Sequence, residues 1–305
     1  MASLVHVLCY HRVVADDECH ENRPYFLRGT AISEAVFRQQ IQDCAEHFEC
    51  LDERRALDVL SGAVDLKRTG CWVTFDDAYA DVIHVAAPIL DVAGIRPSVF
   101  VSTAVLDGSA LPADRWYATL NTAKRRRGTL RGPEPLEFDL DQTESLHRFI
   151  DGPEKRRFLH SSPSDQEVAL SRLAAELDAD STGPGCRFYL DAADILDLSQ
   201  RGWSIGSHSV SHPIMVGLAG EAQRRELAVS RARIAAILGM VPRTFAYPDG
   251  AWDDVTANRV RKSGYLGAVT ITPRVARSGD SMFAIPRTLI RNDPKFIRAL
   301  SSLSD

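Results

Sequence analysis

The chain has 305 residues, with 36 Lys and Arg against 41 Asp and Glu, so its formal net charge is −5. This mildly acidic balance excludes a strongly basic nucleic-acid-binding protein, and we expect no nucleic acid among its partners. The length allows a large buried core, and no apolar run reaches the ~18 residues of a transmembrane segment.

The expected elements in the first third of the chain alternate between strand and helix. They are a strand at 5–10, a helix at 33–47 capped by Ser33, a strand at 71–75, a helix that ends at Gly94 and a strand at 97–102. The alternation breaks at residues 106–189, which are rich in charge, Pro and Gly. We interpret 106–189 as a largely helical insertion subdomain.

Regular alternation returns after the insertion. We expect helices at 192–201, 220–238 and 253–262, and strands at 203–207, 244–247, 266–270 and 285–290. This order predicts an α/β fold, a distorted or incomplete (β/α) barrel formed by residues 1–105 and 190–305. In such a fold the chemistry lies at the carboxyl ends of the strands.

The six cysteines show no Cys-x-x-Cys spacing. In a chain of this size they are typical of free thiols in a reducing compartment rather than of a disulfide framework. The first residues lack the basic region and the long apolar stretch of a signal peptide. We therefore expect a cytoplasmic location, and the sequence leaves the oligomeric state open.

Two motifs at predicted strand ends carry the chemistry: Thr-Phe-Asp-Asp at 74–77 and His-Ser-Val-Ser-His at 208–212. Two imidazoles and one carboxylate leave a coordination position for water, which is typical of a catalytic zinc site. The second carboxylate is then suited to take a proton from that water. Either motif alone is also explained by a helix N-cap or by coincidence, so the prediction depends on their occurring together.

In combination, these motifs resemble those of the NodB-homology polysaccharide deacetylases, carbohydrate esterase family four. Phe-Ala-Tyr-Pro-Asp-Gly at 245–250 is a third matching piece, and the resemblance covers about residues 70–103 and 190–272. It implies that Asp77, His208 and His212 hold one divalent metal and that Asp76 is the general base. Zinc suits two nitrogens and one oxygen, with cobalt, nickel and manganese as alternatives.

The third motif departs from the family pattern. Ala246 stands where many members have an arginine that orients the base, so we assign that task to Arg287, whose alternative is an ordinary surface position on a strand. Asp249 replaces the family's tyrosine. We expect its carboxylate to face away from the site.

The segment from Tyr247 to Asp249 is expected to offer a backbone N–H to an oxyanion, because that role needs no side chain. Tyr247 is assigned as a catalytic residue of this segment, and Pro248 and Asp249 are assigned to substrate binding.

No histidine follows His212, so the family's general acid, a histidine in a C-terminal Leu-x-His segment, is missing from its usual place. The N-terminal segment Val-Leu-Cys-Tyr-His at 7–11 is similar to the start of the circularly permuted branch, the poly-N-acetylglucosamine deacetylases. The resemblance implies that His11, as an imidazolium, is the general acid. The alternative is a structural histidine at a strand end.

The function implied by the resemblance is that of a metal-dependent hydrolase acting on a non-peptide carbon–nitrogen bond. It would remove an N-acetyl group from a sugar or polysaccharide, using metal-activated water, an Asp base and a His acid. The alternatives are an N-deformylase or other small-molecule amidohydrolase, and a carbohydrate-binding protein with a relic site. Trp116 in the insertion is a candidate for stacking on a sugar ring, although such aromatics more often pack their own core.

Overall fold

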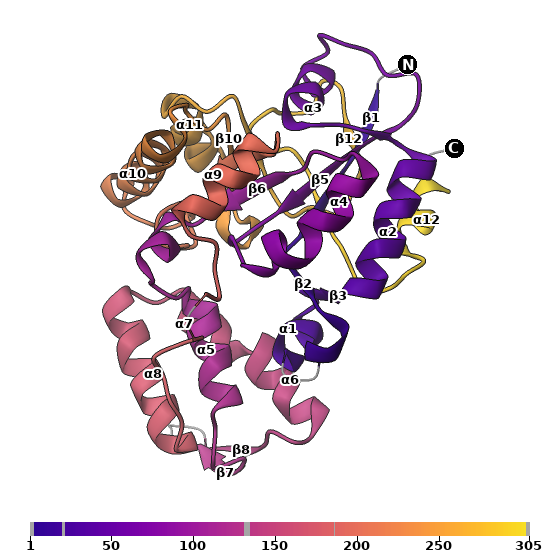
Figure 1. Cartoon of the computed structure of the whole chain (residues 1–305). Helices are drawn as coiled ribbons and strands as arrows, with labels where there is room; N and C mark the ends of the chain where they lie inside the picture. The colour runs from indigo at the N-terminus through magenta and orange to yellow at the C-terminus, as the bar shows by residue number, and fades with distance from the viewer. Residues whose placement is uncertain (1–2, 20–21, 131–134, 186, 303–305) are drawn as a thin grey trace.

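The computed structural model describes residues 3–19, 22–130, 135–185 and 187–302 (Figure 1). Its centre is a nine-stranded sheet with the order β11-β10-β9-β6-β5-β1-β12, in which β13 also pairs with β1 and β4 with β5. The strands are β1 Leu4–Tyr10, β4 Glu49–Cys50, β5 Gly70–Phe75, β6 Ser98–Val101, β9 Ser204–Ser207, β10 Thr244–Ala246, β11 Gly267–Val269, β12 Ala276–Arg277 and β13 Thr288–Leu289.

All pairs in this sheet are parallel except β1 with β12. The curled sheet and its helices confirm the predicted incomplete (β/α) barrel. Figure 1 shows helices around the outside of the sheet. They are α2 Glu34–His47, α3 Glu53–Leu60, α4 Ala87–Ala93, α9 Ala192–Gln200, α10 Gly220–Leu238, α11 Asp254–Lys262 and α12 Phe296–Ser301.

Local sequence signals set several of these boundaries. The Ser33 hydroxyl accepts a hydrogen bond from the Val36 N–H and caps α2, as predicted. Gly94 and Gly239 end α4 and α10 in the left-handed conformation, which glycine adopts without a Cβ clash. The π-helical turn η2, Val82–Ala86, leads directly into α4, so the helical run that ends at Gly94 begins with a π-helical turn.

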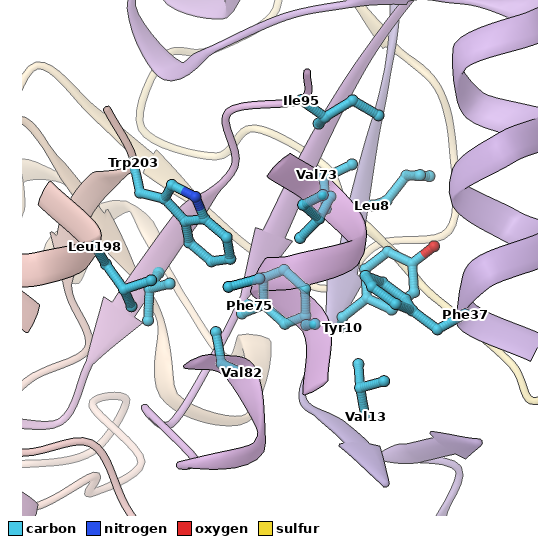
Figure 2. Close-up of a cluster of buried hydrophobic side chains, with 14 of the residues drawn as sticks. Leu8, Tyr10, Val13, Phe37, Val73, Phe75, Val82, Ile95, Leu198 and Trp203 are labelled. Atoms are coloured by element: carbon cyan, nitrogen blue, oxygen red, sulfur yellow. The ribbon is translucent and has the colours of Figure 1, made fainter. Parts of the chain in front are cut away.

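An aromatic cluster fixes the neighbouring ends of β1 and β5. Phe75 stacks on Trp203 with ring centroids 6.1 Å apart and on Tyr10 at 5.5 Å, and Phe37 of α2 packs edge-on against Tyr10 (Figure 2). All four side chains are almost fully buried. Because Tyr10 and Phe75 are also paired in the sheet, the residues that follow them emerge side by side.

The region predicted as an insertion forms a separate group of elements that Figure 1 shows below the sheet. These are α5 Pro112–Asn121, β7 Arg127–Leu130, β8 Leu136–Asp139, α6 Thr143–Asp151, α7 Pro153–Leu159 and α8 Pro163–Leu177; η3 Thr103–Asp107, which precedes them, packs Val105 into the core of the sheet. Their hydrophobic cluster also takes in Tyr25 of α1, Arg23–Arg28, and Tyr79. The boundary at residues 106–189 therefore stays an interpretation, since α1 shares this core.

Two short strands, β2 Arg12–Val14 and β3 Ala31–Ser33, pair with each other where the chain passes to α1 and back. The remaining elements are η1 Asp16–Glu18 and η4 Pro248–Gly250. The five described cysteines are free, while Cys186 lies outside the described residues. Within the described ranges, no helix is both long enough and apolar enough to span a bilayer.

Candidate metal and catalytic site

The sheet brings the predicted site residues to one edge. His11 follows β1, Asp76 follows β5 and His208 follows β9, all at the carboxyl ends of parallel strands. The Asp76 N–H donates to the Tyr10 carbonyl at 3.0 Å, which extends the pairing of β1 and β5 by one residue. The neighbouring strands therefore place one carboxylate between two imidazoles from distant parts of the sequence.

A second carboxylate faces both histidines of the His-Ser-Val-Ser-His motif. Asp77 Oδ1 lies 3.5 Å from His208 Nε2 and 3.4 Å from His212 Nε2. Asp77 Oδ1 is buried and has no hydrogen-bond partner among the described residues. One oxygen and two nitrogens that converge in this way fit a divalent cation, and the orphaned oxygen is the atom that such a cation would satisfy.

The tautomer of His208 suits a metal ligand. Its Nδ1 lies 2.8 Å from the carbonyl oxygen of Ala246. Because a carbonyl only accepts, Nδ1 must carry the hydrogen, and Nε2 is left with a lone pair facing Asp77. Ala246, where the family often has an arginine, thus contributes to the site through its backbone.

Burial controls the ionisation of these three groups. It lowers the pKa of His208 to about 3 and also lowers the pKa of His212. Burial, followed by the charges of Asp114 and Asp76, raises the pKa of Asp77 well above its usual range. Two neutral imidazoles and a carboxyl group that lacks a counter-charge form a donor set that a bound cation would stabilise.

Four residues in or next to the two motifs have left-handed backbone conformations without being glycine: Asp77, Ala78, Ser209 and His212, with φ of 73°, 63°, 69° and 57°. Such conformations cost about 1–3 kcal/mol each and persist only where the surroundings impose them. They are concentrated in the two predicted motifs, where they turn the side chains toward one another.

Asp76 is held by Arg287 in a bidentate ion pair, with Nη1–Oδ1 and Nη2–Oδ2 distances of 2.7 and 2.6 Å. Arg287 also donates to Thr74 Oγ1 at 3.1 Å and to the Thr270 carbonyl at 3.2 Å. The arginine is 0% exposed, so the alternative of a surface position is wrong. Burial alone would raise the pKa of Asp76, but the charges of Arg287, His208 and His11 and the hydrogen bonds from Arg287 together outweigh burial and lower that pKa, which keeps the carboxylate ionised.

His11 lies beside Asp76, and its buried Nδ1 has no hydrogen-bond partner among the described residues. Burial lowers the pKa of His11 to about 4, against a raising contribution from Asp76. Burial thus favours the neutral form of His11, whereas the expected general acid is an imidazolium. Cys9, one of the cysteines predicted to be free thiols, donates from its Sγ to Asp76 Oδ2 at 3.6 Å.

Tyr247 is placed in the core instead of the site. Its N–H donates to the Val269 carbonyl at 3.1 Å, and its hydroxyl donates to the Phe283 carbonyl at 2.9 Å. The side chain is 0% exposed. With both of its donors engaged, Tyr247 has none to offer to a reacting group, which corrects its assignment as a catalytic residue.

Asp249 lies on η4 with a φ of 56°, after the buried Pro248. Its carboxylate is 46% exposed and points toward Arg28, with a 3.6 Å separation from Nη2. The other arm of Arg28 donates to Asp151 at the end of α6. Arg28 thus connects the loop that carries Asp249 to the insertion.

Trp116 lies in the core of the insertion. It is 5% exposed, its Nε1 donates to the Phe149 carbonyl at 2.8 Å, and its ring lies 5.0 Å from that of Phe158. The structure therefore favours the alternative that Trp116 packs the core of the insertion, and its ring has no exposed face for a sugar.

Sequence reasoning missed Asp114, a fully buried carboxylate on α5. It accepts hydrogen bonds from the hydroxyls of Tyr25 at 2.8 Å, Tyr79 at 3.0 Å and Tyr189. Tyr79 lies two residues after Asp77, so this network ties the insertion to the first motif. No sequence signal indicated it, because the three tyrosines are scattered along the chain and share no spacing.

Comparisons with known proteins agree with the fold and with the motifs. The family model "Polysaccharide deacetylase" matches residues 178–268. YxkH of Bacillus subtilis (strain 168), itself a suggested polysaccharide deacetylase, is 27% identical over 106 residues. The aligned segment covers 35% of this chain and only 38% of YxkH.

Solved structures extend the likeness in fold to the whole chain. The deacetylase PplD of Streptococcus pyogenes, solved in complex with acetate, superposes with a TM-score of 0.66 at 17% identity over 98% of both chains. IcaB of Ammonifex degensii gives a TM-score of 0.63 at 18% identity, covering 98% of this chain and 96% of that one. A de-N-acetylase from Aggregatibacter actinomycetemcomitans gives 0.61 at 15% identity, with 95% and 96% covered.

An incomplete (β/α) barrel with Asp-Asp and His-x-x-x-His motifs at its strand ends is the arrangement that the resemblance to the NodB-homology carbohydrate esterases implies. Residues 178–268 match the polysaccharide deacetylase family model, and the fold of the whole chain is similar to those of PplD and IcaB.

Proposed function

We propose that this protein is a divalent-metal-dependent hydrolase that removes the N-acetyl group from an acetylated sugar or polysaccharide. The observation that carries the proposal is the convergence of Asp77, His208 and His212 beside the ion-paired Asp76. A binding protein would need no buried, ionised carboxylate next to such a ligand set. Names of the similar proteins, deacetylase and de-N-acetylase, support the same reaction class.

Asp77, His208 and His212 would hold the metal, and zinc is the ion that best suits two neutral imidazoles and one carboxylate. When bound, a divalent cation polarises an amide carbonyl and makes water more acidic. His208 enters this site already in the tautomer that it needs, with Nδ1 engaged by Ala246.

Asp76 is the proposed general base. Arg287 donates to both oxygens of Asp76 and helps to keep the carboxylate ionised, so Asp76 can take a proton without first having to lose one. The bidentate pair also fixes the direction of the carboxylate, which limits where the attacking water can lie. Arg287 would therefore act through Asp76, as a positioning residue.

His11 is the proposed donor to the leaving amine. Because burial favours its neutral form, it must first receive a proton during the reaction, and its ring lies close enough to Asp76 to relay one. The N–H of Asp249 is the proposed oxyanion donor of the 247–249 segment, since the Tyr247 N–H already bonds within the sheet.

The test is acetate release from N-acetylated glucosamine oligomers, with N-formylated sugars assayed beside them. We expect the Asp76→Asn and His208→Ala variants to lose ~10²-fold or more of the activity, and a chelator to abolish it. His47→Ala, which alters an exposed histidine on α2, serves as the control and should retain activity. Undiminished release from either site variant would contradict the proposal.

A further inference from the structure

The two histidines of the proposed metal site lie at the ends of a short loop, residues 208–212. The carbonyl groups of this loop accept hydrogen bonds on one side. Donors at the end of β6 and the start of η3 reach three consecutive carbonyls of this loop: Ser102 Oγ to His208 at 3.0 Å, Thr103 N to Ser209 at 3.1 Å and Ala104 N to Val210 at 2.9 Å. These contacts leave the N–H groups of the loop pointing the other way.

Glu226 of α10 receives those N–H groups. Its Oε2 accepts from the Val210 N–H at 2.7 Å and from the Ser211 N–H at 3.0 Å. Its Oε1 accepts from the Ser211 hydroxyl at 2.9 Å. One carboxylate thus satisfies three donors of the segment that separates the two metal-binding histidines.

The helix that carries Glu226 is itself fixed against the sheet. Leu227 and Ile234 of α10 are fully buried, and Ser230 Oγ accepts a hydrogen bond from Ser207 Oγ of β9 at 2.8 Å. Glu226 is therefore carried by a helix that is fixed to β9, the strand that leads directly to His208.

The loop needs such support because its backbone is strained. Ser209 and His212 have φ of 69° and 57°, and the His212 N–H turns back to Ser209 Oγ at 3.0 Å. Without Glu226, the N–H groups of Val210 and Ser211 would turn to water, and the loop could relax from its left-handed turns. His212 Nε2 would then leave its position 3.4 Å from Asp77 Oδ1.

We infer that Glu226 is a positioning residue for the metal site: it sets the spacing of His208 and His212 by holding the loop between them. This inference rests on the proposed function, because it concerns the same cation. Residues that orient metal ligands typically change metal affinity about 10–100-fold when they are removed.

The proposed role depends on the length of the side chain and on its acceptor, and not on its charge. Glutamine has the same length, and its carbonyl oxygen accepts from both backbone N–H groups while its amide donates to the Ser211 hydroxyl. Aspartate keeps the charge but is one methylene shorter, so it cannot reach all three donors from the same backbone position.

The experiment measures the affinity of the purified full chain for Zn²⁺ by competition with a chromophoric chelator, with the thermal midpoint of each variant recorded. We expect Glu226→Ala and Glu226→Asp to weaken binding by about 10–100-fold, and Glu226→Gln to remain within about threefold of the wild type. Glu221→Ala is the matched control on α10, since the Glu221 carboxylate is exposed and pairs with Arg224 of its own helix. It should bind as the wild type does.

Wild-type affinity in Glu226→Asp together with weak binding in Glu226→Gln would overturn the inference, because charge would then matter more than reach. Wild-type affinity in Glu226→Ala would overturn it as well. If the wild type binds Zn²⁺ and the Glu226 series behaves as expected, but no acetate is released from any substrate, the positioning role stands and the proposed activity fails. A wild type that binds no Zn²⁺ would overturn both.

Discussion

The guanidinium of Arg287 and the carboxylate of Asp76 form a buried, bidentate pair, although 211 residues separate them in the chain. The planar fork of arginine matches the two oxygens of a carboxylate, a geometry that lysine cannot reproduce. Arg287 stands just before β13, which pairs with β1, so it approaches Asp76 from across the first strand. It thereby supplies a cation to Asp76, the proposed base, although Ala246 stands at the position where the resemblance implies an arginine.

Replacing Arg287 with lysine should lower the activity by roughly 10–10³-fold, because one point charge can neither hold both oxygens of Asp76 nor fix its plane. The charge of Arg287 lowers the pKa of Asp76 against the effect of burial. A weaker pair should therefore move the acid limb of the pH–rate profile to higher pH. The measurement is acetate release across the acidic range.

Arg277→Lys is the control for this substitution, since Arg277 lies on the edge strand β12 with its side chain exposed. Its profile should match that of the wild type. An Arg287→Lys enzyme with unchanged activity and an unchanged acid limb would show that the ion pair does not orient the base.

The contribution of the buried His208 to the stability of the metal-free protein should fall as the pH drops below neutrality. Burial lowers the pKa of His208 to about 3, from an ordinary value of 6.5. Between these two values the unfolded chain binds a proton that the folded chain does not, so His208 alone reduces the free energy of unfolding by about 1.4 kcal/mol per pH unit on acidification. His11 acts in the same direction down to about pH 4.

Urea unfolding of the metal-free protein from about pH 7 to about pH 5 measures this slope. Asp77 opposes it, because its raised pKa lets the folded state bind a proton first. Comparison of variants isolates His208: His208→Gln should show a flatter dependence, and His47→Gln, on the surface of α2, should keep the wild-type slope. Identical slopes in all three proteins would contradict the assigned burial of His208.

Loss of Arg28 should free the Asp249 loop from the insertion. Arg28 pairs with both Asp249 and Asp151, and all three side chains are partly exposed. Such pairs contribute roughly 0–1 kcal/mol to stability, so Arg28→Gln should fold normally. We expect about a 3–10-fold loss in kcat/KM, because the Asp249 carboxylate is released next to the proposed oxyanion donor.

Arg23→Gln is the control, since Arg23 lies on the same helix and donates to Thr143 of the insertion without touching the site. High salt should weaken the ion pairs of Arg28 in the wild type. The difference in kcat/KM between the wild type and Arg28→Gln should therefore become smaller. Equal effects of the two substitutions would indicate that α1 merely stabilises the insertion.

The features that could be predicted from the sequence are those set by neighbouring residues: the helices, the strands and the two motifs at strand ends. Strand and helix periodicity, the Ser33 cap and the Gly94 and Gly239 stops gave the principal elements to within a few residues. Parallel strands share a carboxyl edge, so the meeting of residues 76–77 with 208–212 followed from the two motifs and the predicted strand ends.

Long-range packing determined what could not be predicted. Trp116 was available in principle for a sugar ring, and only the tertiary structure assigns it to the core beside Phe149 and Phe158. The neutrality of His11 depends on its burial, which no spacing encodes. Glu226 and Asp114 lie on helices with no motif around them, and their partners come from distant segments of the chain.

The most direct test of the account is the stoichiometry of tightly bound divalent metal, measured by mass spectrometry of the purified protein. The account predicts about one ion per chain in the wild type and far less in Asp77→Asn, His208→Ala and His212→Ala, each of which removes one of three ligands. His47→Ala should keep the full complement. A wild type without metal, or ligand variants that retain it, would contradict a shared ion at Asp77, His208 and His212.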